Sequence, residues 1–94
     1  MHTVKQLERI LKGLANRRRL AIIKLLAHRK ELPVASIADH IRLSFTSTSK
    51  HLSLLHQLDV VERRQESLTV YYCLSDTPPP VVKLLLSTIS NSRE

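Results

Sequence analysis

The 94-residue sequence predicts a mainly α-helical fold with one small β-hairpin, in the order ααααββα. Apolar residues recur every three or four positions through most of residues 3–58, as they do along amphipathic helices. After Asp59 the apolar residues alternate with polar ones, which is the period of a strand, and a proline-rich segment then precedes a last apolar stretch. The length fits one domain, and we expect residues 1–94 to form it.

The first two helices are predicted over residues 3–14 and from Asn16 to about His28. The first has apolar residues at helical spacing, namely Val4, Leu7, Ile10, Leu11 and Leu14. The Asn16 side chain can accept hydrogen bonds from the free N–H groups that begin the second helix. We place the apolar face of the second helix at Leu20, Ile23, Leu26 and Ala27.

The third and fourth helices are predicted from about Val34 to Ile41 and from Ser44 onward. Pro33 fits the first turn of the third helix, and the Ser44 hydroxyl can cap the fourth. The third helix turns Ile37, Ala38 and Ile41 inward, and the fourth turns Thr48, Leu52 and Leu55 inward. We expect the Thr48 hydroxyl to bond back to an earlier carbonyl of its own helix.

The outward face of the fourth helix is polar and cationic. It carries Thr46, Lys50, Ser53 and Gln57, with Ser47 and Ser49 on its flanks. Small hydroxyl side chains allow a helix to approach the major groove of DNA closely, and a lysine supplies charge to phosphates or guanine. This face is therefore typical of a DNA-recognition helix, although a merely solvated helix face would have a similar composition.

The hairpin is predicted between Val61 and Leu74, with a turn around Gln65, Glu66 and Ser67. One face would carry Val61, Arg63, Leu68, Val70, Tyr72 and Leu74, and the other would carry Glu62, Arg64, Thr69, Tyr71 and Cys73.

The last helix is predicted from Pro80 to Ser90, after Pro78 and Pro79 stop the strand, and residues 91–94 are expected to fray. This helix is apolar nearly all round, whereas a single small domain covers only one face of it. We therefore expect a homodimer built from the first and last helices, with Leu7, Ile10, Leu11, Val82, Leu85 and Ile89 at the interface.

Composition favours a nucleic-acid partner. The chain has 15 Lys and Arg residues against 8 Asp and Glu, a formal net charge of +7. Such an excess favours polyanions because binding releases their condensed counterions. Arg17, Arg18 and Arg19 oppose the dipole at the start of the second helix, so either a phosphate contact or a solvated basic cluster accounts for them. With one cysteine and no long apolar run, we expect a cytoplasmic protein outside the membrane.

Four helices, a hairpin and a helix follow the order of a winged helix-turn-helix, and four segments resemble the ArsR/SmtB family of repressors. These segments are Leu11–Asn16 with Arg19, Leu20 and Ile23; Ile37–Ala38; Leu43–Leu52; and Arg63–Arg64 with Val70–Tyr72. The resemblance implies a homodimer whose recognition helices enter successive major grooves of an inverted-repeat operator, with the wings reaching the flanking backbone or minor groove. Asp59 stands where the family usually has a glycine that ends the recognition helix with a positive φ, and aspartate tolerates that region better than most residues. The candidate DNA-contacting residues are Ser44, Thr46, Ser47, Ser49, Lys50, His51, Arg63, Arg64 and Arg19.

The metal sites common in that family are not expected in this chain, and we expect no cofactor. The family's frequent Cys-x-Cys pair corresponds to Pro33 and Ala35, and the last helix offers Lys83 among aliphatic and hydroxyl side chains. His2, His28 and His40 lie on separate predicted elements, while His51 and His56 diverge on one helix. Cys73 is either a redox-sensitive thiol on the outer strand face or an inert strand residue.

Two other classes of function compete with DNA binding. A winged-helix protein-interaction module would use the apolar last helix and the basic face without specific DNA binding. An enzyme is not expected, because the sequence has no glycine-rich phosphate loop, no nucleophile turn and no paired carboxylates.

Overall fold

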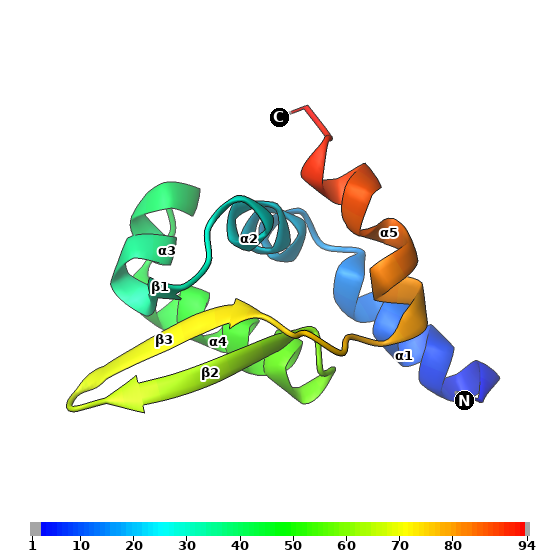
Figure 1. Cartoon of the computed structure of the whole chain (residues 1–94), viewed down its shortest axis with the longest axis horizontal. Coiled ribbons are helices and arrows are strands. Elements are labelled where there is room, and N and C mark those ends of the chain that lie inside the picture. Colours follow the sequence, from blue (N-terminus) through cyan, green and yellow to red (C-terminus); the bar gives the residue numbers. More distant parts are fainter. Residues whose placement is uncertain (1–2, 94) are drawn as a thin grey trace.

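The computed structural model describes residues 3–93, so His2 and Glu94 lie outside the described residues. The elements are α1 (Val4–Leu14), α2 (Arg17–His28), β1 (Leu32–Pro33), α3 (Val34–Ile41), α4 (Phe45–Gln57), β2 (Val61–Glu66), β3 (Thr69–Leu74) and α5 (Pro80–Ser90). Helices α1 and α5 lie at one end, and the β2–β3 hairpin projects from the other (Figure 1). The mainly helical winged fold predicted from the sequence is confirmed, with one additional short strand.

Local capping explains why the helices begin where the sequence predicted. The Asn16 side-chain oxygen accepts hydrogen bonds from the backbone N–H groups of Arg18 and Arg19, at 3.0 and 3.1 Å. The Ser44 hydroxyl accepts from the Ser47 N–H at 3.1 Å and thereby fixes the first turn of α4. Asp59 adopts the predicted positive φ, of 61°, directly after that helix.

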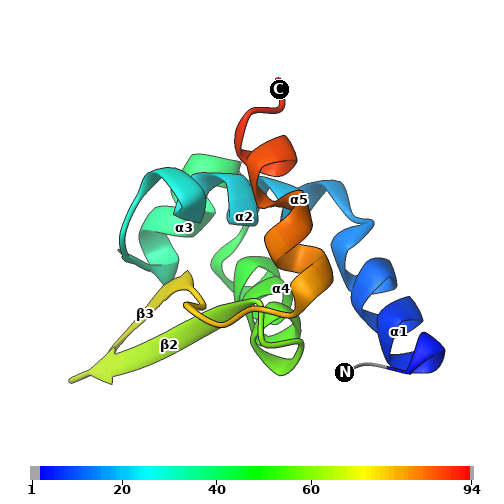
Figure 2. The same ribbon diagram turned by 45° about the vertical axis from the view of Figure 1, so that its right-hand side comes forward.

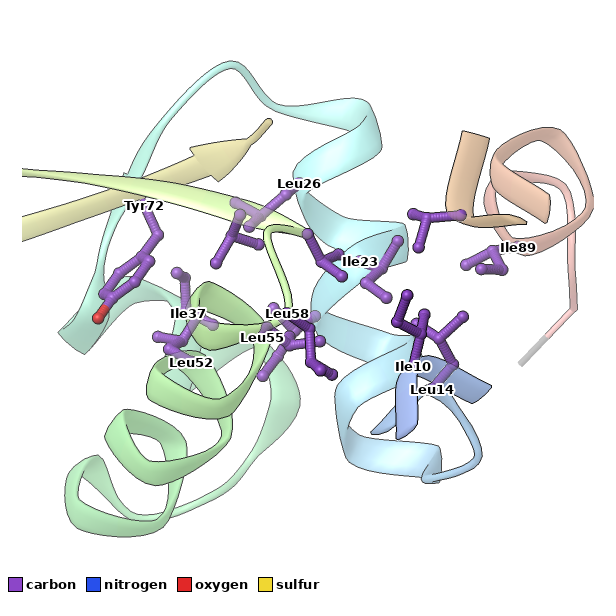
Figure 3. Packing of buried hydrophobic residues seen from close by; sticks show 14 of the residues in the cluster. Ile10, Leu14, Ile23, Leu26, Ile37, Leu52, Leu55, Leu58, Tyr72 and Ile89 are labelled. Atoms are coloured by element: carbon purple, nitrogen blue, oxygen red, sulfur yellow. The ribbon is translucent and has the colours of Figure 1, made fainter. Parts of the chain in front are cut away.

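The hydrophobic core joins all five helices and the sheet (Figure 3). Leu52 and Leu55 are buried as predicted, and they meet Ile23 of α2 and Ile37 of α3 in one cluster. The prediction for Ala27 is wrong: it is exposed, and Ile22 is buried on that helix instead, because α2 is covered along a face shifted toward its other flank.

Thr48 is buried on the inward face of α4 as predicted, but its hydroxyl does not make the expected bond. Among the described residues, this oxygen is a buried side-chain polar atom with no hydrogen-bond partner. The methyl group of Thr48 therefore gains packing while its hydroxyl carries a desolvation cost.

The sheet has the order β1-β3-β2 and is antiparallel throughout. Glu66 pairs with Thr69, so the hairpin turn consists of Ser67 and Leu68, later than the predicted position. Ser67 adopts a φ of 57° at this tight turn, and Leu68 is 95% exposed at the tip instead of lying on the inward face. The strand β1 was not predicted, because its two residues pair with Tyr71 and Tyr72 far along the chain.

Asn91 and Ser92 make hydrogen bonds after the end of α5, within the segment that is expected to fray. The Ser92 hydroxyl donates to the Thr88 carbonyl at 2.6 Å, and the Ser92 carbonyl accepts from the Lys24 ammonium of α2. Both views show α5 and the residues after it on the side of the molecule away from the hairpin tip (Figures 1 and 2). Within residues 3–93, no helix is both long enough and apolar enough to cross a bilayer.

Candidate nucleic-acid interface

The outer face of α4 is an open, polar surface at the end of the molecule that bears the hairpin. Its side chains line a shallow cleft of about 470 Å³, formed by Phe45, Thr46, Ser49, Lys50, Ser53, Leu54 and Gln57. The predicted residues Ser44, Thr46 and Lys50 are exposed, and Ser47 and Ser49 are half-buried on the flanks. Short hydroxyl side chains leave the helix backbone accessible, so a groove of matching width can approach it closely.

A second groove, of about 300 Å³, separates α4 from the wing, which we define as β2, β3 and their turn. Ser49 and Ser53 line it from the helix, and Arg63 lines it from β2. Arg63 pairs in register with the buried Tyr72, so the alternation of the strand directs it to the same face as the core, toward α4. The structure thus brings Arg63 into one concave surface with the outer face of α4.

Arg64 lies on the opposite face of the wing and is already paired. Its guanidinium donates to both carboxylate oxygens of Glu31, at 2.8 and 3.2 Å, and to Glu66 at 2.7 Å. It also lies over the Tyr71 ring, 4.6 Å from the ring centroid. The hydrogen bond from Arg64 lowers the pKa of Glu31, and the bonds from Glu31 and Glu66 raise the pKa of Arg64.

Arg19 and His51 connect α2 to α4. The Arg19 Nε donates to the Gly13 carbonyl, and its Nη1 lies 3.2 Å from Nδ1 of His51. Burial lowers the pKa of His51, and the nearby charges of Arg19 and Arg18 lower it further. A neutral His51 that accepts at Nδ1 carries its proton on Nε2, so that nitrogen can donate to another group.

The three arginines of the predicted basic cluster have different surroundings. Arg18 is half-buried and donates to the Ile41 carbonyl at 3.4 Å, and Arg19 is half-buried against His51. Arg17 is exposed beside a groove between α2 and α5. The predicted site residues therefore fall into one surface of α4 and Arg63, a supporting pair of Arg19 and His51, and the separately paired Arg64.

The residues predicted at the dimer interface divide by exposure. Ile10, Val82 and Ile89 are buried inside the chain, and Leu85 is half-buried. Leu7 and Leu11 are exposed on α1, where they line an apolar hollow with Val4. Leu84 of α5, which is 78% exposed, was not predicted at the interface, because periodicity does not show which side of an all-apolar helix is covered.

Cys73 and the histidines are the remaining candidates for reactive or metal-binding groups. Cys73 is half-buried, and its pKa is raised by burial and by the negative charges of Glu62, Glu31 and Asp76. A thiol of raised pKa is largely protonated at neutral pH and reacts slowly. Among residues 3–93, no three His, Cys, Asp or Glu side chains come together in a way that could hold a metal ion.

Comparison with known proteins places this architecture in a family. Residues 16–63 match the family model described as bacterial regulatory protein, arsR family. The transcriptional activator HlyU of Vibrio cholerae is 40% identical over 68 residues, which are 72% of this chain and 62% of HlyU. The cadmium resistance transcriptional regulatory protein CadC of Listeria innocua is 38% identical over 65 residues, which are 69% of this chain and 55% of CadC.

The chain therefore matches less than two thirds of the length of these curated relatives. The fold similarity extends further. It covers 92% of this chain and 76% of the homodimeric winged helix-turn-helix DNA-binding domain Mb0332 from Mycobacterium bovis, with a TM-score of 0.76 and 34% identity. From the family match over the helix-turn-helix and this agreement of fold, the chain belongs to the ArsR family of bacterial regulatory proteins and is a winged helix-turn-helix protein.

Proposed function

We propose that this protein binds double-stranded DNA sequence-specifically as a homodimer and regulates transcription, as a repressor. The observation that carries the proposal is the concave surface formed by the outer face of α4 and Arg63 of the wing. It combines short hydroxyl side chains with cations, on a chain of net charge +7. The Mycobacterium bovis relative is a homodimeric DNA-binding domain, HlyU is a transcriptional activator and CadC is a transcriptional regulatory protein, which supports DNA binding and the regulation of transcription. The repressor part of the proposal rests on the resemblance to the ArsR/SmtB family of repressors.

The residues of this surface divide by role in the proposed complex. Thr46, Ser47, Ser49 and Lys50 face the base edges or the nearest phosphates, because α4 enters the major groove with its N-terminal half. Ser44 fixes the start of that helix and remains exposed beside the same phosphates. Arg63 contacts the backbone next to the groove.

Arg19 and His51 support the recognition helix from behind in this proposal. Arg19 already bonds to the α1 carbonyl of Gly13 and approaches His51, so it fixes how α4 is held against α2. The Nε2–H of His51 is then the donor that remains for a phosphate oxygen. Arg64 is paired with Glu31 and Glu66. Its proposed role is therefore to position the wing, and not to contact a phosphate.

A homodimer would present two copies of α4 to an inverted-repeat operator. In a symmetric dimer the same surface meets itself, and the half-sites lie about one turn of DNA apart, roughly 34 Å. Leu7 and Leu11 of α1 and Leu84 and Leu85 of α5 form the proposed contact, with Ile10, Val82 and Ile89 packed beneath them. Such a dimer bound over a promoter would block transcription in the cytoplasm.

The proposal is tested by measuring operator affinity against salt concentration, with selected and scrambled duplexes. Ser47→Ala and Lys50→Ala should change affinity unequally among operator variants, because base contacts carry the sequence preference. Arg63→Ala should weaken binding to all sequences evenly and lower the salt slope by roughly one unit for each phosphate that is no longer neutralised. Thr77→Ala and Lys30→Ala are matched controls, since these exposed residues lie on the β3–α5 and α2–β1 connections, outside α4 and the proposed dimer contact.

Unchanged affinity and preference in the Ser47 and Lys50 variants, with binding retained, would show that α4 is not the reading helix. A chain that bound no duplex at low salt would favour the protein-interaction module instead.

The proposed regulator also works without the family's common metal sites, because Pro33 and Ala35 cannot ligate metal. Release of DNA by stoichiometric zinc or arsenite would contradict that part of the proposal.

A further inference from the structure

Phe45 is an apolar side chain left on the polar face of the recognition helix. It is the single phenylalanine of the chain and the first residue of α4, and 58% of it is exposed. Of the other large apolar residues of this helix, Leu52 and Leu55 are fully buried, and Leu54 is half-buried against the core. Burying a phenylalanine usually stabilises a fold, and Phe45 forgoes much of this gain in the free protein.

The position of Phe45 joins the two hollows of the candidate interface. It borders the cleft on the outer face of α4 beside Thr46 and Lys50, and it also lines the groove between α4 and the wing. The Ser44 cap directly before it holds the first helical turn. The ring is therefore held among the residues proposed to contact DNA, in the part of a recognition helix that reaches base edges.

A phenyl ring can recognise only one feature of the major groove. It has no hydrogen-bond donor or acceptor for the polar base edges, whereas the 5-methyl group of thymine is an apolar projection into that groove. Resting on the proposed function, we infer that Phe45 is a specificity-determining residue that packs against a thymine methyl group in each half-site. Its hydroxyl-bearing neighbours are short enough to let the ring reach the base.

The test removes the methyl group alone. A preferred duplex is first selected from a random library with the full-length wild-type chain, and each thymine is then replaced singly by uracil. We expect a loss of about fourfold in affinity at one position of each half-site, since burying one methyl-sized group contributes about 0.8 kcal/mol. Phe45→Ala should bind the thymine and uracil duplexes equally.

Two further variants make the assignment specific. Phe45→Gln removes the apolar ring but keeps a side chain at this position, and it should also lose the thymine preference. Leu68→Ala removes another exposed apolar side chain, at the tip of the wing, and should keep the wild-type ratio between thymine and uracil duplexes. Because Phe45 is largely exposed, both Phe45 variants should keep the wild-type circular dichroism and unfolding midpoint.

The outcomes separate this inference from the function on which it rests. If wild-type protein binds a selected duplex but no uracil replacement matters, or if both Phe45 variants keep the penalty, the inference is overturned and the proposed function stands. An exposed ring that served a protein partner would give this result. If no duplex is selected over scrambled DNA, the proposed function itself fails.

Discussion

Gly13 lies inside α1, although glycine is less favourable than alanine in a helix by about 1 kcal/mol. A Cβ at this position would lie 2.2 Å from Cδ1 of Leu58, which is buried in the core. The Gly13 carbonyl also accepts the bond from Arg19. The chain's one glycine therefore allows α1 to approach the end of α4 closely.

We expect Gly13→Ala to lower the free energy of unfolding by about 1–3 kcal/mol, because overpacking against Leu58 outweighs the gain in helix propensity. The measurement is urea unfolding at one fixed protein concentration. In the background of Leu58→Ala, which removes the obstructing atoms, the same substitution should cost nothing or stabilise. Stabilisation of the wild-type chain by Gly13→Ala would contradict the close approach seen here.

His51 makes stability depend on pH in a direction fixed by its lowered pKa. The unfolded chain binds a proton near the ordinary imidazole pKa of about 6.5, while the folded chain binds it only at lower pH. The stabilisation that arises from this pKa difference is therefore fully present above about pH 6.5, and it is lost as the pH falls toward the pKa of His51 in the folded chain. Protonation would also place a charge beside Arg19 and Arg18.

His51→Gln should flatten the acid side of the stability curve, because glutamine does not titrate. Urea midpoints of the two proteins would be compared at a series of pH values from about 8 to about 5, with each protein at the same concentration. We expect the wild-type chain to lose stability relative to the variant below about pH 6.5. Parallel curves would show that His51 titrates alike in the folded and unfolded chains.

At the scale of elements, the wing is held to the body by an ion pair between residues 33 positions apart. Glu31 precedes β1, and its bidentate pairing with Arg64 of β2 joins the α2–β1 connection to the projecting hairpin. Exposed ion pairs contribute little to the free energy of unfolding, and a bidentate arginine pair has the most favourable geometry. The pair therefore orients the wing more than it stabilises the fold.

Glu31→Gln distinguishes a positioning role of Arg64 from direct contact with phosphate, because the two predict opposite signs. Loss of the pair frees the wing, so we expect DNA affinity to fall by up to about fivefold. Removal of a negative charge and release of Arg64 would instead strengthen binding if Arg64 reached a phosphate. Glu8→Gln is the matched control, since Glu8 pairs with Lys12 on α1, away from the wing.

At the scale of the whole molecule, the exposed apolar residues of α1 and α5 lie at the end opposite the tip of the wing (Figures 1 and 2). Leu11 is 42% exposed and Leu84 is 78% exposed. A contact between two copies through this end would leave both recognition surfaces free to face one DNA duplex. Full burial of an exposed leucine contributes about 1.5–3 kcal/mol, and each of these leucines would gain the share of that energy that corresponds to its exposed fraction.

We expect Leu11→Glu and Leu84→Glu to give monomer or insoluble protein, because each places an unpaired charge in the proposed contact at a cost of several kcal/mol. These residues are preferable to Leu85, which is half-buried and also packs within its own chain. Leu68→Glu, at the wing tip, makes the same chemical change and should leave the dimer intact. Light scattering at micromolar concentration measures the molar mass of the wild-type protein and of the three variants. A wild-type protein that is monomeric under these conditions would refute the dimer.

The sequence by itself determined the five helices, the two hairpin strands, their order and the inward face of α4. Caps at Asn16 and Ser44 and the spacing of Leu52 and Leu55 are local properties, since each involves hydrogen bonds or periodicity within a few residues. The positive φ of Asp59 was predicted from the family resemblance. That resemblance was confirmed, because the family model matches residues 16–63, which include Ile37–Ala38 and Leu43–Leu52.

Only the tertiary structure decided which surfaces remain open and which charges are already paired. The strand β1, the separation of Arg63 from Arg64, and the exposure of Leu84 depend on segments distant in sequence. The two-residue period of a strand places Arg63 and Arg64 on opposite faces. It does not show that Arg64 pairs with Glu31 or that Arg63 lies toward α4. The hydrophobicity of α5 likewise shows that the helix can be buried, whereas only its packing against the rest of the chain shows which of its sides is covered.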